Sequence, residues 1–287
     1  MRRYLSLVKF SHTIFALPFA LLGYFLAAHH LPEGFAWRTL GLVVLCMVFA
    51  RSAAMAFNRL LDRHIDRANP RTAGREVPAG LISARSAGLF VAVNSLLFVA
   101  CAYFINPLCF ALSPVALLVI LGYSYTKRFT FLCHFVLGLG LALAPLGAWL
   151  AVGGQFDLLP LLYAGAVLFW VAGFDIIYAL QDEAFDRSQN LRSVPVWLGT
   201  ERALWLSNFL HVGCAGFLLA AAYQLSRLFP AAGWLHWTGV VLFIGLLVYQ
   251  HRLVRPGDLS RVDLAFFTTN GIASLLFGGL VILDLYI

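Results

Sequence analysis

Apolar stretches long enough to cross a bilayer follow one another along almost the whole chain. A membrane-spanning helix takes roughly 17–25 apolar residues, and nine stretches satisfy this. They are residues 12–31, 39–58, 86–105, 108–126, 131–152, 158–180, 203–224, 234–251 and 264–286. Of the 287 residues, 61% are hydrophobic and only 11% are charged, far from the balance of a soluble domain. Because lipid cannot hydrogen-bond to the backbone, these stretches predict helices. We therefore expect an all-α polytopic bundle of nine transmembrane helices in one domain, residues 1–287.

The basic residues predict the orientation of this bundle. If the N-terminus lies in the cytosol, seventeen of the 20 Lys and Arg fall on the cytosolic side, and only Arg38 and Arg227 fall outside. The remaining one, Arg51, lies within a predicted span. Cytosolic loops carry an excess of Lys and Arg, so we expect a cytosolic N-terminus and an external C-terminus. The net charge of +7 is thereby explained by topology, and we expect no nucleic-acid partner.

A first acidic motif follows the second predicted span. Arg51, Asn58, Asp62 and Asp66 are spaced by seven, four and four residues. Helix side chains at this spacing lie on one face, so all four can point into one interior. Ionised groups at membrane depth cost roughly 2.5–3.5 kcal/mol each on insertion scales, which favours a functional role for them.

A second acidic motif follows the sixth predicted span. Asp175, Tyr178, Asp182 and Asp186 are spaced by three, four and four residues, which again places them on one helical face. The two motifs would leave the membrane on the same side. Their acidic ends would then face each other across the bundle.

Two facing sets of oxygen ligands indicate a site for Mg²⁺. This ion prefers oxygen, keeps several waters, and binds one or two carboxylates together with substrate phosphates. The candidate ligands are Asn58, Asp62, Asp66, Asp182 and Asp186. The alternative is that these are solvated helix ends, with Asp62 and Asp66 paired to neighbouring arginines.

Basic side chains on the same predicted face could bind a polyphosphate. Arg75 and Lys127 are the first candidates for direct phosphate contact, and Arg71 and Arg128 are further candidates that could equally be loop charges setting the topology. Tyr123 lies one helical turn before Lys127 and could hydrogen-bond the same group, or it could anchor the helix at the membrane interface.

These motifs resemble those of the UbiA superfamily of intramembrane prenyltransferases. The similar features are Asn58-x-x-x-Asp62-x-x-x-Asp66 after the second span and Asp182-x-x-x-Asp186 after the sixth. The Tyr-Ser-Tyr-Thr-Lys-Arg stretch at 123–128 and Arg51 are also similar. The family's usual Asn-Asp pair is Asn58-Arg59 here, a departure that leaves the spaced aspartates in place.

The resemblance implies Mg²⁺-dependent transfer of a polyprenyl group from an all-trans polyprenyl diphosphate to an aromatic acid. Asp62, Asp66, Asp182 and Asp186 would be catalytic through the metal. Arg51, Asn58 and Asp175 would form the acceptor site, with Arg51 on the acceptor carboxylate and Asp175 orienting a hydroxyl or taking the ring proton. Arg51 could instead be the structural partner of Asp175. Tyr178 could stabilise the allylic cation through its π face or serve as helix packing.

Two segments narrow the choice of acceptor. Residues 8–20 and 69–75 are similar to those of the superfamily members that act in bacterial quinone biosynthesis. Such enzymes act in the cell inner membrane, in ubiquinone or menaquinone biosynthesis. Their substrate 4-hydroxybenzoate is our first candidate for the acceptor. The alternative acceptor is 1,4-dihydroxy-6-naphthoate, which also carries a hydroxyl and a carboxylate. No obligate protein partner is evident from the sequence.

Two other protein classes share part of this pattern. A CDP-alcohol phosphotransferase also uses aspartates and metal, but its motif requires Asp-Gly and Ala-Arg steps, whereas Asp62 is followed by Arg63. A membrane transporter could use Arg51 and Asp175 as a buried ion pair, but it would not require the second set of spaced carboxylates.

Overall fold

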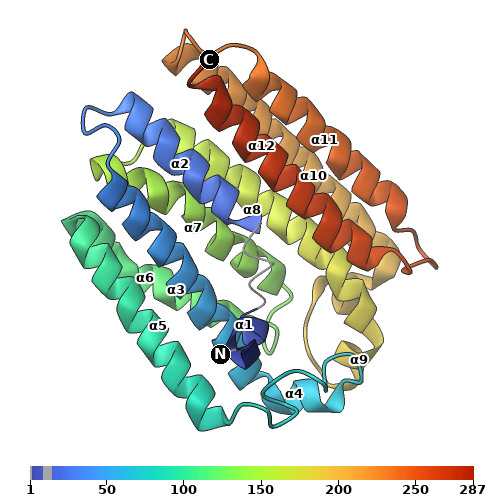
Figure 1. The fold of residues 1–287 in the computed structure, drawn as a ribbon. Coiled ribbons are helices and arrows are strands. Elements are labelled where there is room, and N and C mark those ends of the chain that lie inside the picture. Colours follow the sequence, from blue (N-terminus) through green and yellow to red (C-terminus); the bar gives the residue numbers. More distant parts are fainter. Residues whose placement is uncertain (1, 9–14) are drawn as a thin grey trace.

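The computed structural model describes residues 2–8 and 15–287, and over these ranges the chain is helical (Figure 1). The predicted first span therefore begins outside the described residues, as does much of the 8–20 segment. The α-helices are α1 (Arg2–Leu7), α2 (Leu17–His30), α3 (Trp37–Leu61), α4 (Arg63–Ala68), α5 (Ala84–Ile105), α6 (Pro107–Thr126), α7 (Cys133–Gly153), α8 (Leu158–Ala179), α9 (Glu183–Ser188), α10 (Val194–Leu228), α11 (Leu235–Leu253) and α12 (Asn270–Asp284).

The prediction of an all-helical membrane protein is confirmed. Seven helical segments within the described ranges are long and apolar enough to cross a membrane. They are Trp37–Leu61, Ala84–Ile105, Pro107–Thr126, Cys133–Gly153, Leu158–Ser188, Val194–Leu228 and Leu264–Asp284. The other two predicted spans correspond to α2, which has 14 residues, and α11, which has 19. The count of nine spans and the orientation of the termini stay predictions.

The long helices form two groups that meet along α7 and α8. Helices α3 and α6 pack on α7, with α5 against α3 and α6. Helices α10, α11 and α12 gather on the far side of α8, and α2 packs against both α7 and α12 (Figure 1). Aromatic side chains fill the second group, where Trp170 packs against Phe19 and Phe243 with ring centroids 5.4 and 5.3 Å apart. The buried indole N–H of Trp170 donates to Asn270 Oδ1 at 2.9 Å, which satisfies both polar groups inside the apolar core.

Gly138 allows α7 and α8 to approach closely. A Cβ atom at this position would lie 2.5 Å from the carbonyl oxygen of Leu168, closer than any side chain can sit. Small residues permit such contact between membrane helices. The close approach lies near the start of α7 (Cys133–Gly153) and in the middle of α8 (Leu158–Ala179), two turns before Asp175.

Both acidic motifs lie where a long helix breaks. Asp62 has φ −87° and ψ 6° and separates α3 from α4, whereas Asp182 ends a short 3₁₀ segment, η2 (Leu180–Asp182), between α8 and α9. The helical spacing of each motif is therefore interrupted, at Asp62 and at Asp182. Helices α4 and α9 turn across the same end of the bundle, which is also the end where α1 lies (Figure 1).

Candidate active site

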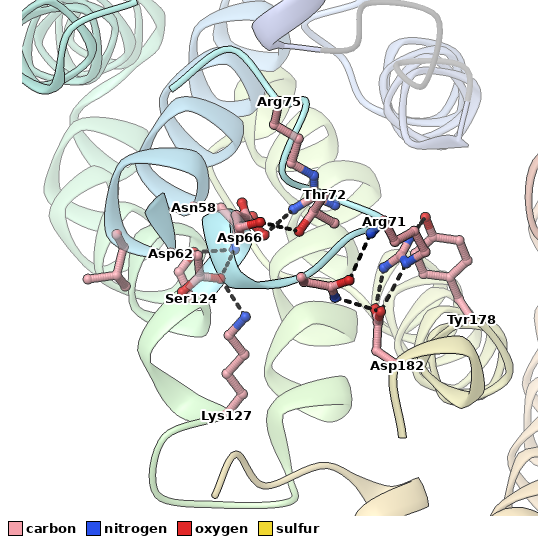
Figure 2. A network of polar contacts seen from close by, with 12 residues as sticks. Asn58, Asp62, Asp66, Arg71, Thr72, Arg75, Ser124, Lys127, Tyr178 and Asp182 are labelled. Carbon is pink, nitrogen blue, oxygen red and sulfur yellow. Dashed lines mark hydrogen bonds and ion pairs between the residues drawn. The ribbon is translucent and has the colours of Figure 1, made fainter. Parts of the chain in front are cut away.

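Asp62 is the most enclosed carboxylate of the site and is held by two cations. It is 1% exposed. The Lys127 ammonium lies 2.5 Å from its Oδ2 atom, and Arg128 donates to its Oδ1 atom at 2.7 Å. Asn58, one turn earlier on α3, donates to Oδ2 at 3.3 Å (Figure 2). The structure therefore brings together the first acidic motif and the basic residues that follow α6.

Asp66 has a cation on one oxygen only. Arg75 lies 2.8 Å from its Oδ1 atom, whereas its Oδ2 atom is buried and has no hydrogen-bond partner among the described residues. The Thr72 hydroxyl donates to the backbone carbonyl of Asp66 at 3.1 Å and fixes the loop against α4. A buried carboxylate oxygen without a donor is uncommon in native proteins and marks a position where a cation can bind.

Asp182 receives two side chains from the loop after α4. Arg71 binds it through both Nε and Nη2, and the Asn69 amide donates to Oδ1 at 3.0 Å (Figure 2). Arg71 also donates to the Tyr178 hydroxyl at 2.8 Å. Burial lowers the pKa of Arg71, but the bonds to Asp182 and Tyr178 outweigh it, so this pKa is raised above its ordinary value. Arg71 therefore stays charged and joins the loop of the first motif to the second motif.

Tyr178 and Asp186, the other predicted site residues near Asp182, have different surroundings from it. The Arg71 guanidinium carbon lies over the Tyr178 ring, 5.1 Å from the ring centroid. The same ring packs against Phe266, with the two ring centroids 4.1 Å apart. Asp186 lies on α9 within electrostatic range of Lys127 and Asp182. Within the described ranges, its carboxylate makes no hydrogen bond or ion pair.

The carboxylates fit a metal site in which a substrate supplies part of the ligand set. Over residues 2–8 and 15–287, no three His, Cys, Asp or Glu side chains converge closely enough to hold an ion by themselves. Mg²⁺ requires only one or two carboxylates when phosphates and waters complete its shell. The donors here are hard oxygens, and the free Oδ2 of Asp66 is one such ligand. The residues present therefore fit Mg²⁺ bound together with a phosphate ligand.

An apolar cavity of about 370 Å³ lies beside this network, between α3, α5, α6 and α7. Arg51 and Tyr123 line it, and the lining continues along α6 as far as Cys109. At 1.5 Å per residue this stretch of α6 is about 20 Å long. The Arg51 Nε atom is buried and has no hydrogen-bond partner among the described residues. The cavity is therefore apolar along its length and cationic at one place, two helical turns from Asn58.

Asp175 is paired with His134, a residue not predicted from the sequence. His134 Nδ1 lies 2.7 Å from Asp175 Oδ2. Asp175 is thus not the partner of Arg51, and that alternative is wrong, since the described carboxylates form no ion pair with Arg51. Tyr123 lies within electrostatic range of Asp175, Asp62 and Arg51, so these groups surround one region. A polar residue within a predicted span was the only sequence signal for His134.

Arg59, the departure from the usual motif, is also part of this end of the bundle. It is 4% exposed, and its Nη1 atom is buried without a hydrogen-bond partner in the described part of the chain. Asp66, Glu76 and Arg75 lie within electrostatic range of it. It places one more cation beside the first motif.

Comparisons with known proteins agree with this geometry. The model of the UbiA prenyltransferase family matches residues 16–272. The chain is 32% identical over 275 residues to a 4-hydroxybenzoate octaprenyltransferase of Nitrosomonas europaea, covering 93% of this chain and 88% of the relative.

Solved structures of UbiA homologs share the fold of this chain. The apo structure of a UbiA homolog from Aeropyrum pernix K1 superimposes with a TM-score of 0.84 at 33% identity, over 95% of this chain and 98% of that one. A UbiA homolog from Archaeoglobus fulgidus, bound to GPP and Mg²⁺, shares the fold with a TM-score of 0.75 at 22% identity, over 99% of this chain and 100% of that one. The chain is a multi-pass membrane protein and belongs to the UbiA prenyltransferase family.

Proposed function

We propose that this protein transfers a polyprenyl group from an all-trans polyprenyl diphosphate to the ring of a hydroxylated aromatic acid, with Mg²⁺ as cofactor. The first candidate acceptor is 4-hydroxybenzoate, in quinone biosynthesis in a bacterial inner membrane. One observation carries the proposal. A cluster of carboxylates and cations adjoins an apolar cavity lined in part by Arg51, whose buried Nε atom has no hydrogen-bond partner among the described residues.

The polar cluster suits a diphosphate. Lys127, Arg128, Arg75 and Arg71 each hold a carboxylate of the site, and each can turn to a phosphate oxygen once that carboxylate binds another cation. Mg²⁺, held by Asp62, Asp66, Asp182 and Asp186 with Asn58 in support, would neutralise the charge on the departing diphosphate. The basic side chains add fixed positive charge at the same place, which stabilises the leaving group without reorganisation of water.

The apolar cavity suits the prenyl tail. Its walls are apolar except at Arg51, Tyr123 and Ser113, and the Ser113 hydroxyl already donates to the Phe110 carbonyl. An apolar polyprenyl chain is therefore suited to this cavity. The tail would lie between α3, α5, α6 and α7, with its diphosphate end toward Asp62. The A. fulgidus homolog of the same fold binds GPP and Mg²⁺, which agrees with this assignment.

Arg51 and Asp175 suit the two polar groups of the acceptor. A carboxylate would satisfy the unpartnered Nε of Arg51, and Asp175 would accept from the ring hydroxyl. The allylic C–O bond breaks and its electron pair leaves with the diphosphate. An electron-rich ring carbon then bonds to the prenyl C1, and the ring loses a proton, for which Asp175 is the proposed base. Arg71 and Phe266 already engage the Tyr178 ring, so its proposed part is to hold Arg71 beside Asp182.

Product analysis tests this function. Membranes containing the protein would be supplied with Mg²⁺, an all-trans polyprenyl diphosphate and a panel of aromatic acids that includes 4-hydroxybenzoate and 1,4-dihydroxy-6-naphthoate. Mass spectrometry is expected to detect an acid heavier by one prenyl group. Membranes without the protein are the control. The absence of prenylated product with every acid, or a product from an acid lacking the ring hydroxyl, would contradict the proposal.

A further inference from the structure

His134 makes two hydrogen bonds that join three helices at the edge of the candidate site. It lies at the start of α7 and is 2% exposed. Its Nδ1 atom is 2.7 Å from Asp175 Oδ2 on α8, and its Nε2 atom is 3.2 Å from the backbone nitrogen of Val194 at the start of α10. Both ring nitrogens are therefore used, and the ring is fixed at both ends.

The second bond determines which nitrogen carries the proton. A backbone N–H can only donate, so Nε2 of His134 must accept from Val194 and carries no proton. The single ring proton of the neutral imidazole is then on Nδ1, from which it is donated to Asp175. Because Asp175 Oδ2 is used in this way, its Oδ1 atom is left as the free acceptor. Within residues 2–8 and 15–287, Oδ1 has no hydrogen-bond partner, and the Asp175 side chain is 22% exposed.

The close packing of α7 and α8 sets this geometry. Gly138 lies one turn after His134, and its contact with the backbone of Leu168 brings the two helices together. The contact leaves His134 little freedom to move relative to Asp175. A fixed donor behind a carboxylate holds the free oxygen of that carboxylate in one direction, which is what an acceptor-binding group requires.

We infer that His134 is a positioning residue. It orients Asp175 so that the free Oδ1 atom receives the hydroxyl of the aromatic acceptor. The inference rests on the proposed function and adds to it a specific relationship between a buried histidine and the hydroxyl group of the substrate. His134 itself touches no substrate in this account and acts only through Asp175.

Two substitutions distinguish positioning from simple helix packing. His134→Asn keeps an amide N–H near the place of Nδ1 and loses the acceptor for Val194. His134→Gln instead keeps a polar group near the place of Nε2 and loses the donor to Asp175. We expect His134→Gln to lower kcat/KM for the hydroxy acid about 10- to 100-fold, as misplacement of a reacting group does. His134→Asn is expected to retain most of the activity, and KM for the prenyl diphosphate is expected to stay the same in both variants.

A double-mutant cycle with Asp175→Asn completes the test. If His134 acts through Asp175, adding His134→Gln to Asp175→Asn should reduce kcat/KM by no more than about 2-fold further. Thermal unfolding in detergent would be measured for all variants, so that loss of folding is recognised. Equal losses in His134→Asn and His134→Gln, or fully multiplicative losses in the double variant, would overturn the inference while leaving the proposed function intact. A wild-type protein that prenylates no aromatic acid would overturn both.

Discussion

The Lys127 ammonium and the Asp62 carboxylate form an ion pair of 2.5 Å that joins the end of α6 to the end of α3. Lys127 is 28% exposed and Asp62 only 2%, measured on the side chains, so the cation reaches in from the open side toward a buried anion. The same arrangement recurs for Arg75 on Asp66 and for Arg71 on Asp182. The cations therefore neutralise the carboxylates of the site.

Removing one carboxylate charge should nearly abolish turnover. Asp62→Asn and Asp182→Asn keep the shape of the side chain, so the expected loss in kcat reflects charge and ligand strength. We expect a loss of about 10²–10³-fold, as for removal of one preorganised electrostatic group. Steady-state prenyl transfer in membranes is the measurement. Asp258→Asn, which changes a carboxylate in an exposed turn, is the matched control and should keep wild-type activity. Wild-type rates in Asp62→Asn would show that this carboxylate is not a ligand.

Arg51→Ala should act on the acceptor and spare the donor. If the guanidinium binds the acceptor carboxylate, its loss costs roughly 1.5–3 kcal/mol, or about one to two decades in apparent KM for the aromatic acid. KM for the prenyl diphosphate should change little. A decarboxylated acceptor, which cannot bind Arg51, is the control, and its rate should depend little on the substitution. Equal damage with both acceptors would assign Arg51 to the diphosphate or to the structure of the cavity.

Narrowing the cavity should select against long prenyl chains. Gly147 lines the cavity, and a Cβ atom there would meet nothing within 4 Å, so Gly147→Leu adds volume inside the cavity without a clash at its base. We expect kcat/KM to fall for long polyprenyl diphosphates and to change little for a two-unit analogue. Gly216→Leu is the matched control, because Gly216 is also unobstructed and does not line the cavity. An equal effect on both chain lengths would place the tail elsewhere.

Labelling of introduced cysteines tests the predicted topology. In a background without the five native cysteines, Gly74→Cys lies in the loop after α4 and Gln155→Cys lies between α7 and α8. A membrane-impermeant maleimide should reach Gly74→Cys only from the cytosolic side and Gln155→Cys only from outside. Labelling of both positions from the same side would contradict the nine-span prediction.

Hydrophobicity and spacing predicted the helical bundle and the two acidic motifs, because both depend on local sequence. The length of an apolar stretch is fixed by bilayer thickness, and spacing by four places side chains on one helical face. The breaks at Asp62 and Asp182 were missed, since each break depends on one residue's backbone conformation within otherwise helical sequence. The spacing still placed Asp62 and Asp66 correctly as neighbours. The Asp66 N–H donates to the Asp62 carbonyl across the break at 2.7 Å.

Contacts between distant segments could not be predicted in the same way. His134 and Asp175 are 41 residues apart, and Asn69 and Asp182 are 113 apart. Each pair depends on how distant segments pack in three dimensions, as at the close contact between Gly138 of α7 and Leu168 of α8. From its position in a span, Arg51 could have been the structural partner of Asp175. The structure instead leaves the Nε atom of Arg51 without a hydrogen-bond partner beside a cavity.

If the carboxylates and cations at this end of the bundle act as proposed, diphosphate is released as the aromatic acid is prenylated. The most direct measurement counts both products in one reaction, with inorganic diphosphate assayed enzymatically and prenylated acid by mass spectrometry. We predict one diphosphate for each prenylated acid in the presence of Mg²⁺, and neither product after EDTA until Mg²⁺ is restored. Prenylation that continues in EDTA, or release of CMP from a CDP-alcohol in place of diphosphate, would contradict the account.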